Sequence, residues 1–147
     1  MHRKNLKGWN ELKTNDSWSV FKIMGEFVDG FEKLGKIGPC VSIFGSARTH
    51  KDDKYYKLAT EIAEKIVELG FGIITGGGPG IMEAANKGAK KALGPSVGLN
   101  IDLPFEQSEN RYIDDDKSLN FDYFFVRKVM FMKYAQAFVV MPRSEEV

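Results

Sequence analysis

Short apolar runs and amphipathic stretches alternate along the chain after an amphipathic N-terminal segment. Runs that are too short for helices predict five strands, at residues 39–44, 71–74, 96–100, 119–124 and 137–141. Helical spacing predicts helices between them, at residues 55–69, 82–93 and 126–134. Strands alternating with helices indicate an α/β, Rossmann-like fold, with a doubly wound parallel sheet. Right-handed crossovers favour the strand order 3-2-1-4-5, with the chain reversing between strands 1 and 4.

The segment before the first strand predicts an amphipathic helix. Its apolar stripe, spaced 4, 3, 4 and 3 residues apart, comprises Val20, Met24, Phe27, Phe31 and Leu34. Asp16 or Ser17 suits the N-cap and Gly35 suits the end. We therefore expect an irregular arm over residues 1–16 and a single domain over residues 17–147. The helix could cover its own sheet, which we favour, or pair with a second copy.

Composition narrows the classes of function. The 147 residues carry a formal net charge of only +1, which argues against a nucleic-acid binder. No apolar run approaches the roughly 20 residues that cross a bilayer, and the first residues lack the apolar core of a signal peptide. The single cysteine, Cys40, and two scattered histidines predict no disulfide and no metal site. These features favour a cytoplasmic protein.

The most informative stretch is a glycine turn between the second strand and the next helix. Its glycines are Gly76, Gly77, Gly78 and Gly80. Glycines let a ligand approach the backbone, and the free N–H groups of a helix start favour an anion such as phosphate. A dinucleotide fingerprint would need glycine where Ile81 stands, and a P-loop would need a Gly-Lys-Ser/Thr ending. The alternative is that the glycines only allow a tight turn and close packing.

Two further segments should lie at the same sheet edge as the glycine turn. Gly45 and Ser46 follow the first strand, and Arg127 lies near a helix start, where the helix dipole disfavours a cation. We therefore expect Arg127 to have an anionic partner. The sequence leaves open whether that partner is a substrate phosphate or a nearby aspartate (Asp114, Asp115, Asp116 or Asp122).

The long connection over residues 101–118 is rich in Asp, Glu and Asn. Loops of this length in compact domains often bind ligands, and a carboxylate from this one could orient a ribose hydroxyl. The opposing interpretation is that its aspartates form a solvated surface.

Three motifs together resemble the LOG family, the cytokinin riboside 5′-monophosphate phosphoribohydrolases once described as lysine decarboxylases. They are Phe44-Gly-Ser-Ala-Arg48, Gly76-Gly-Gly-Pro-Gly-Ile-Met-Glu83 and Phe125-Val-Arg-Lys-Val129. The resemblance implies a Rossmann-like homodimer, or higher oligomer, that hydrolyses the N-glycosidic bond of a nucleoside 5′-monophosphate. A decarboxylase would need a lysine that binds pyridoxal phosphate, and no such lysine is recognisable, so we expect no cofactor.

The resemblance also implies roles for individual residues. Phosphate would be held by Gly45, Ser46, Gly76, Gly77, Gly78 and Gly80. Arg127 would be the catalytic residue, and Lys128 and Glu106 would contact the substrate.

The sequence departs from the family after the fifth predicted strand. The family's second signature is Pro-Gly-Gly-x-Gly-Thr-x-x-Glu, whereas here Arg143 and Ser144 follow Pro142, and the signature's Glu would fall beyond Val147. We therefore expect a domain that is incomplete at its C-terminal end relative to the family. Hydrolysis, non-catalytic binding or carriage of a nucleotide or phosphorylated cofactor, and a role in assembly all stay open.

Overall fold

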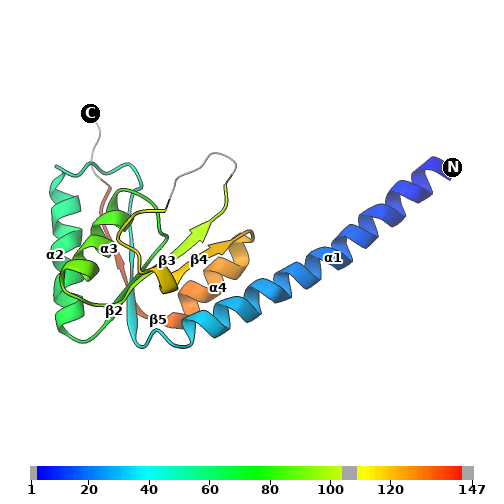
Figure 1. Ribbon diagram of the computed structural model, residues 1–147. Coiled ribbons are helices and arrows are strands. Elements are labelled where there is room, and N and C mark those ends of the chain that lie inside the picture. The colour runs from blue at the N-terminus through cyan, green and yellow to red at the C-terminus, as the bar shows by residue number, and fades with distance from the viewer. Residues whose placement is uncertain (1–2, 104–108, 144–147) are drawn as a thin grey trace.

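The computed structural model describes residues 3–103 and 109–143 of the chain. Its elements, most of them labelled in Figure 1, are α1 (Arg3–Leu34), β1 (Cys40–Phe44), α2 (Lys54–Glu68), β2 (Gly72–Thr75), α3 (Ile81–Lys91), β3 (Ser96–Ile101), the 3₁₀ turn η1 (Asp115–Lys117), β4 (Ser118–Phe121), α4 (Phe124–Tyr134) and β5 (Ala135–Val140). The predicted alternation of strands and helices is confirmed.

The strands form one parallel sheet in the order β4-β3-β2-β1-β5. This confirms the α/β Rossmann-like class, but β4 lies outside β3 instead of beside β1, so the chain reverses between β1 and β5. The pattern of a short apolar strand is the same at either edge. Contacts distant in sequence decide the edge: Gly98 lies opposite Ser118, and Asn100 Nδ2 donates to Leu119 O at 3.1 Å.

Successive side chains of the sheet enter two separate cores, because they point to opposite faces. In β2, Ile74 packs with residues of α4 and the end of α1, whereas Ile73 packs with α2 and α3. Figure 1 shows the two helix pairs on opposite sides of the strands. The sheet is therefore covered on both faces, as the doubly wound fold requires.

The N-terminal helix is longer than its apolar stripe indicates. α1 begins at Arg3, so the irregular arm predicted for residues 1–16 is wrong over the described residues 3–16, and Asp16 and Ser17 lie inside the helix. That stretch contains no proline, and its sequence is mostly polar, so the spacing of apolar residues does not reveal a helix there. Figure 1 shows this half extending well beyond the domain.

The other half of α1 packs on the sheet through Leu34, with Ile23 and Phe27 partly buried against the same core. Three residues of the predicted stripe, Val20, Met24 and Phe31, are however exposed, and α1 contacts mainly α4, so covering its own sheet and pairing with a second copy both stay predictions. Apolar side chains also remain exposed on α1, among them Trp18, Phe21 and Met24. No helix in the described ranges is both long and apolar enough to cross a membrane.

Candidate anion-binding site

The glycine turn lies beyond the carboxyl end of β2 and leads directly into α3. Beside it is a cavity of about 320 Å³, lined by Gly76, Gly77, Gly78, Met82, Asn100, Ile101, Leu103, Phe124 and Arg127. The lining therefore comes from the ends of β2 and β3 and the starts of α3 and α4. Ligands of open α/β sheets bind at this edge.

Arg127 is held in the cavity wall by backbone carbonyl groups. Its Nε donates to Leu99 O at 2.7 Å and its Nη2 donates to Gly76 O at 3.3 Å. The guanidinium also lies over the Phe131 ring, 5.3 Å from the centroid. Burial lowers the pKa of Arg127 from its ordinary value.

No carboxylate among the residues that the structure describes lies within 4.0 Å of Arg127. Of the aspartates considered as partners, Asp114 pairs with Lys90 and Lys117, and Asp116 pairs with Lys117. The aspartate interpretation of Arg127 therefore fails within the described residues. A cation that is partly buried among carbonyl groups leaves room for an anionic ligand.

The start of α3 provides hydrogen-bond donors close to Arg127. α3 begins at Ile81, with Gly80 as its N-cap. Ile81 N–H is occupied by Ser46 O at 3.0 Å, and Gly77 N–H is occupied by Thr75 Oγ1 at 3.0 Å.

Four other N–H groups around the turn have no acceptor among the described residues: those of Gly78, Gly80, Met82 and Glu83. Orphan donors of this kind at a helix start attract anions.

Two glycines of the turn adopt conformations that other residues rarely adopt. Gly77 has φ +81° and Gly80 has φ +70°. A Cβ at Gly77 would overlap Asn100 Oδ1, and one at Gly80 would overlap Ser46 O. The glycines are thus required by backbone geometry and by close contact, which also accounts for the packing role considered from the sequence.

The remaining predicted site residues occupy different surroundings. Gly45 packs against the Ile81 side chain, and Ser46 Oγ accepts from Arg48 N–H at 3.1 Å, so both support the turn without lining the cavity. Lys128 lines a separate apolar groove between α4 and β5. Glu106 lies outside the described residues. The phosphate and substrate roles of these residues stay predictions.

The groove that Lys128 borders has a volume of about 620 Å³ and meets the glycine cavity at Phe124 and Arg127. Half of its lining residues are aromatic and come from β1, α4 and β5: Phe44, Phe124, Phe131 and Phe138.

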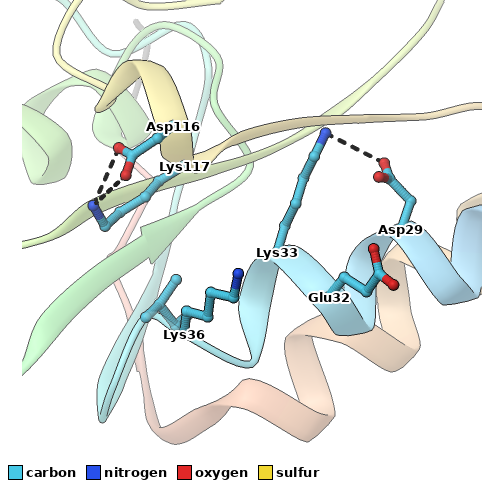
Figure 2. Close-up of a pocket in the computed structure, with 7 residues that line it drawn as sticks. Asp29, Glu32, Lys33, Lys36, Asp116 and Lys117 are labelled. Carbon is cyan, nitrogen blue, oxygen red and sulfur yellow. Dashed lines mark hydrogen bonds and ion pairs between the residues drawn. The ribbon is translucent and has the colours of Figure 1, made fainter.

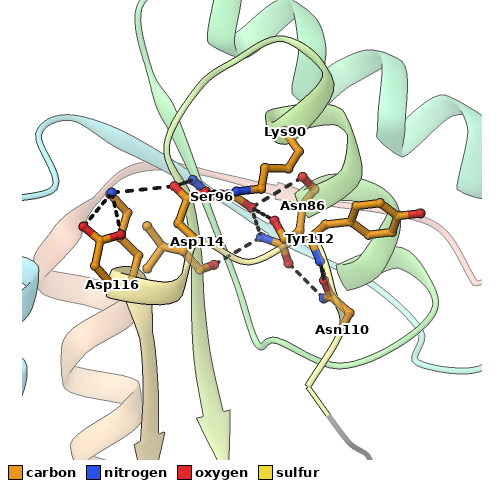
Figure 3. A network of polar contacts seen from close by, with 9 residues as sticks. Asn86, Lys90, Ser96, Asn110, Tyr112, Asp114 and Asp116 are labelled. Atoms are coloured by element: carbon orange, nitrogen blue, oxygen red, sulfur yellow. Dashed lines mark hydrogen bonds and ion pairs between the residues drawn. The ribbon is translucent and has the colours of Figure 1, made fainter.

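A buried polar network supports the turn from the side of α3 (Figure 3). Asn86 Oδ1 accepts from Thr75 Oγ1 at 2.5 Å and from Asn110 Nδ2 at 3.1 Å, and Asn86 Nδ2 donates to Ser96 Oγ at 2.9 Å. Ser96 Oγ in turn donates to Tyr112 O at 2.7 Å. The network joins β2, α3, β3 and the loop after β3.

Sequence reasoning missed Asn86 and Asn110. Asn86 lies in a helix face made of small apolar residues, Ala84, Ala85 and Ala89, all fully buried. A polar side chain in such a stripe needs internal partners, and that signal was available. Asn110 gave no signal, because it lies in an irregular segment.

A second pocket, of about 360 Å³, lies between the end of α1 and η1 (Figure 2). Its lining is mostly charged: Asp29, Glu32, Lys33, Lys36, Asp116 and Lys117, with Ile37. Lys33 pairs with Asp29 at 3.4 Å, and Lys117 pairs with Asp116 at 3.2 Å. Since these charges compensate one another, the pocket is a weaker anion site than the glycine turn.

Cys40 is fully buried in the core under α4, as expected for a small apolar residue. Burial raises the pKa of its thiol to about 11. The thiol therefore stays protonated near neutral pH and is no nucleophile.

The fold is that of an α/β protein with a glycine-lined cavity at the carboxyl edge of its parallel sheet. The chain belongs to the SLOG cluster4 family, whose model matches residues 39–141. The SLOG superfamily includes the LOG family, which confirms the resemblance found in the motifs. Family membership supports a function related to nucleotides.

Two solved structures illustrate the fold. The structural-genomics target TM1055 is 22% identical, with a TM-score of 0.57 over 69% of this chain and 59% of its own. The Moco Carrier Protein from Chlamydomonas reinhardtii is 23% identical, with a TM-score of 0.52 over 73% of this chain and 63% of its own. The chain thus spans less than two thirds of either protein. A search of curated proteins found no match.

Proposed function

We propose that the chain binds a nucleoside 5′-monophosphate, or a closely related phosphorylated ligand, with the phosphate between Arg127 and the start of α3. The observation that carries the proposal is the partly buried Arg127, whose partners among the described residues are carbonyl oxygens and an aromatic ring. A phosphate would supply the missing negative charge and accept charge-assisted hydrogen bonds.

The surrounding donors fit the same ligand. The N–H groups of Gly78 and Gly80 and of the first turn of α3 offer backbone contacts to phosphate oxygens. The acid of that turn, Glu83, has Lys51 4.0 Å away and does not line the cavity, so its charge is partly offset.

Hydrolysis of the N-glycosidic bond is the reaction that we assign to the site if it is an enzyme. It would release a free base and ribose 5-phosphate through an oxocarbenium-like state. Arg127 would hold the phosphate and stabilise developing negative charge. Lys128 and Glu106 stay proposed substrate contacts, and neither a metal nor a cofactor is required for this reaction.

Binding without turnover is the second candidate. The described lining of the glycine cavity contains no Asp or Glu, although glycoside hydrolysis depends on carboxylates to stabilise charge and transfer protons. One protein of similar fold is named as a carrier of a cofactor. A carrier of a nucleotide or phosphorylated cofactor would use Arg127 and the turn in the same way.

The exposed apolar side chains of α1 and of the groove between α4 and β5 support a homodimer or higher oligomer as the working unit. Light scattering at several concentrations tests this, and a monomer throughout would contradict it. A buried, protonated Cys40 suits the reducing cytoplasm that we propose as its location.

The test of the main proposal compares AMP with adenosine, which lacks the phosphate. At a ligand concentration of 100 Kd, AMP should stabilise the fold by about 2.7 kcal/mol. That corresponds to roughly 5–10 °C in melting temperature for a domain of this size. Equal shifts with adenosine and AMP, or none with either, would exclude the phosphate site.

The two candidates separate in a second measurement on the same sample. Chromatography of the AMP incubation detects free adenine if the site hydrolyses its ligand. Stabilisation by AMP together with adenine release supports the hydrolase. Stabilisation without release above a protein-free control supports the carrier.

A further inference from the structure

Asn110 lies where the glycine turn, α3 and the loop after β3 meet. It is 8% exposed, and its backbone N–H, Nδ2 and Oδ1 all form hydrogen bonds within the fold. Its backbone N–H donates to Gly77 O and its Nδ2 donates to Gly78 O, both at 2.9 Å. One side chain and its own backbone thus hold two successive carbonyl groups of the turn.

The orientation of the Asn110 amide is fixed by its other partners. Nδ2 also donates to Asn86 Oδ1 at 3.1 Å, and Oδ1 accepts from Tyr112 N–H at 3.1 Å. Reversing the amide would place a donor against a donor and an acceptor against two acceptors. The Asn110 amide therefore has one stable orientation, which aims its donors at Gly78 O and Asn86.

Holding a carbonyl group also aims the N–H group of the same peptide. In a planar trans peptide the C=O and the N–H point in opposite directions. Because Gly77 C=O points at Asn110, the Gly78 N–H points away from Asn110, and it is one of the donors without an acceptor among the described residues. On the other side of the turn, Arg127 holds Gly76 O, and Gly77 N–H meets Thr75 Oγ1.

We infer that Asn110 is a positioning residue for the anion site: it aims the Gly78 N–H at the ligand by holding the carbonyl groups of Gly77 and Gly78. The inference rests on the proposed function, because it concerns the same phosphate. Asn110 does not line the cavity, so its effect on binding passes through the turn. Asn86 supports it by accepting the second Nδ2 hydrogen.

The variant Asn110→Asp tests this with little change of shape. It keeps the acceptor for Tyr112 N–H but replaces both Nδ2 bonds with repulsion between oxygens. We expect the affinity for AMP, measured by titration calorimetry at pH 8, to fall about tenfold or more. Protonation of the introduced carboxyl supplies one donor again, so the ratio of wild-type to variant affinity should narrow as the pH is lowered.

Asp114→Asn is the matched control. It changes one carboxyl oxygen of the same loop and weakens the bonds to Lys90 and Ser96 N–H, but no hydrogen bond or ion pair within the described residues joins Asp114 to the glycine turn. Its AMP affinity should stay within about twofold of wild type, because Asp114, unlike Asn110, does not hold the carbonyl groups of Gly77 and Gly78. Equal losses in the two variants, or a ratio that does not change with pH, would overturn the positioning role.

A measurement without ligand separates this inference from the proposed function. In ¹⁵N-labelled protein, the amide resonances of Gly77 and Gly78 should shift in Asn110→Asp and stay in place in Asp114→Asn. Unmoved resonances would overturn the inference even if AMP binds. The resonances could instead shift in a protein that binds neither AMP nor inorganic phosphate. That result would overturn both the proposed function and the role of Asn110 in aiming a ligand donor, and Asn110 would then only support the turn.

If Asn110→Asp does not fold, Asn110→Ser is measured in the same way. It removes Nδ2 without adding a charge, and the same shifts and loss of affinity are expected.

Discussion

In the pocket between α1 and η1, Lys33 and Lys117 each lie within 4.0 Å of a carboxylate. In the glycine cavity, Arg127 is partly buried, as Lys117 is, yet its nearest described partners are the carbonyl groups of Leu99 and Gly76. The first pocket holds more charge, but the second holds charge that the fold has not compensated. A ligand gains most where a charge is already desolvated and lacks a counter-charge, so number of charges is a poor guide to a binding site.

Arg127→Gln tests most directly whether the uncompensated charge in the glycine cavity binds the ligand. Removing the charge should lower the affinity for AMP by roughly 10- to 100-fold, because hydrogen bonds to a charged group contribute about 1.5–3 kcal/mol. Stability should change little, since a buried cation without a counter-charge is removed. Calorimetric titration and urea unfolding of the same variant measure the two effects. Unchanged affinity would mean that the phosphate lies elsewhere.

Gly77→Ala tests whether the backbone and close contacts that shape the glycine cavity require glycine at this position. The left-handed backbone at φ +81° and the overlap with Asn100 should together cost about 2–4 kcal/mol of unfolding free energy. Gly38→Ala is the control, because Gly38 has φ +74° but open space around it, and it should cost only about 1–2 kcal/mol. Equal costs in urea unfolding would show that Gly77 is not constrained by contact.

The contribution of the compensated charges around Asp114 can be measured through the dependence of the unfolding free energy on pH. Burial alone would raise the pKa of Asp114, but the hydrogen bonds of Lys90 and of Ser96 N–H, with the charges of Lys90 and Lys117, lower it overall. A lowered pKa stabilises the fold above the unfolded value, about 3.9, and that stability is lost as the pH falls through the folded value.

Asp114→Asn removes this titration. Wild type should lose about 1 kcal/mol more than the variant when the pH is lowered from 6 to 3. Urea unfolding at a series of pH values measures the difference. Parallel losses in the two proteins would mean that the Asp114 interactions contribute no net stability.

Lys33→Ala should have the smallest effect. Its pair with Asp29 is exposed on the surface of α1, and such pairs contribute about 0.2–1 kcal/mol. AMP affinity should stay within about twofold of wild type, because Lys33 is not part of the glycine cavity. A loss as large as that of Arg127→Gln would reverse the ranking of the two pockets.

Local pattern predicts those parts of the fold that local physics determines. Short apolar runs identify the strands, and a local hydrogen bond caps α2, where Asp53 accepts from Tyr55 N–H at 2.8 Å. The place of β4 was not predictable in this way, because it depends on pairing with β3 and on burying Leu119 and Phe121 against α4. The first half of α1 was missed because its sequence is mostly polar and shows no long apolar stripe.

The candidate site likewise has parts that local sequence predicts and parts that depend on contacts between distant residues. The glycine turn and Arg127 could be found because glycine clusters and a cation at a helix start are unusual locally. Whether a carboxylate neutralises Arg127 could not be decided from sequence, since four aspartates lie close enough along the chain. Asn110 could not be found either, because its role depends on Gly77, Gly78 and Asn86, which are distant in sequence from it.

The strand order also determines when the crevice can form during synthesis. β1, β2 and β3 are contiguous neighbours, built from residues 40–101, and can pair while later residues are still being made. β5 must then join β1 across most of the chain, with Cys40 opposite Ala135. Such non-local pairing is slow. The edge between β1 and β5 is therefore completed last. The described lining of the glycine cavity falls within residues 76–127, so nascent chains should acquire their nucleotide affinity once α4 has left the ribosome, before residues 135–140 pair with β1.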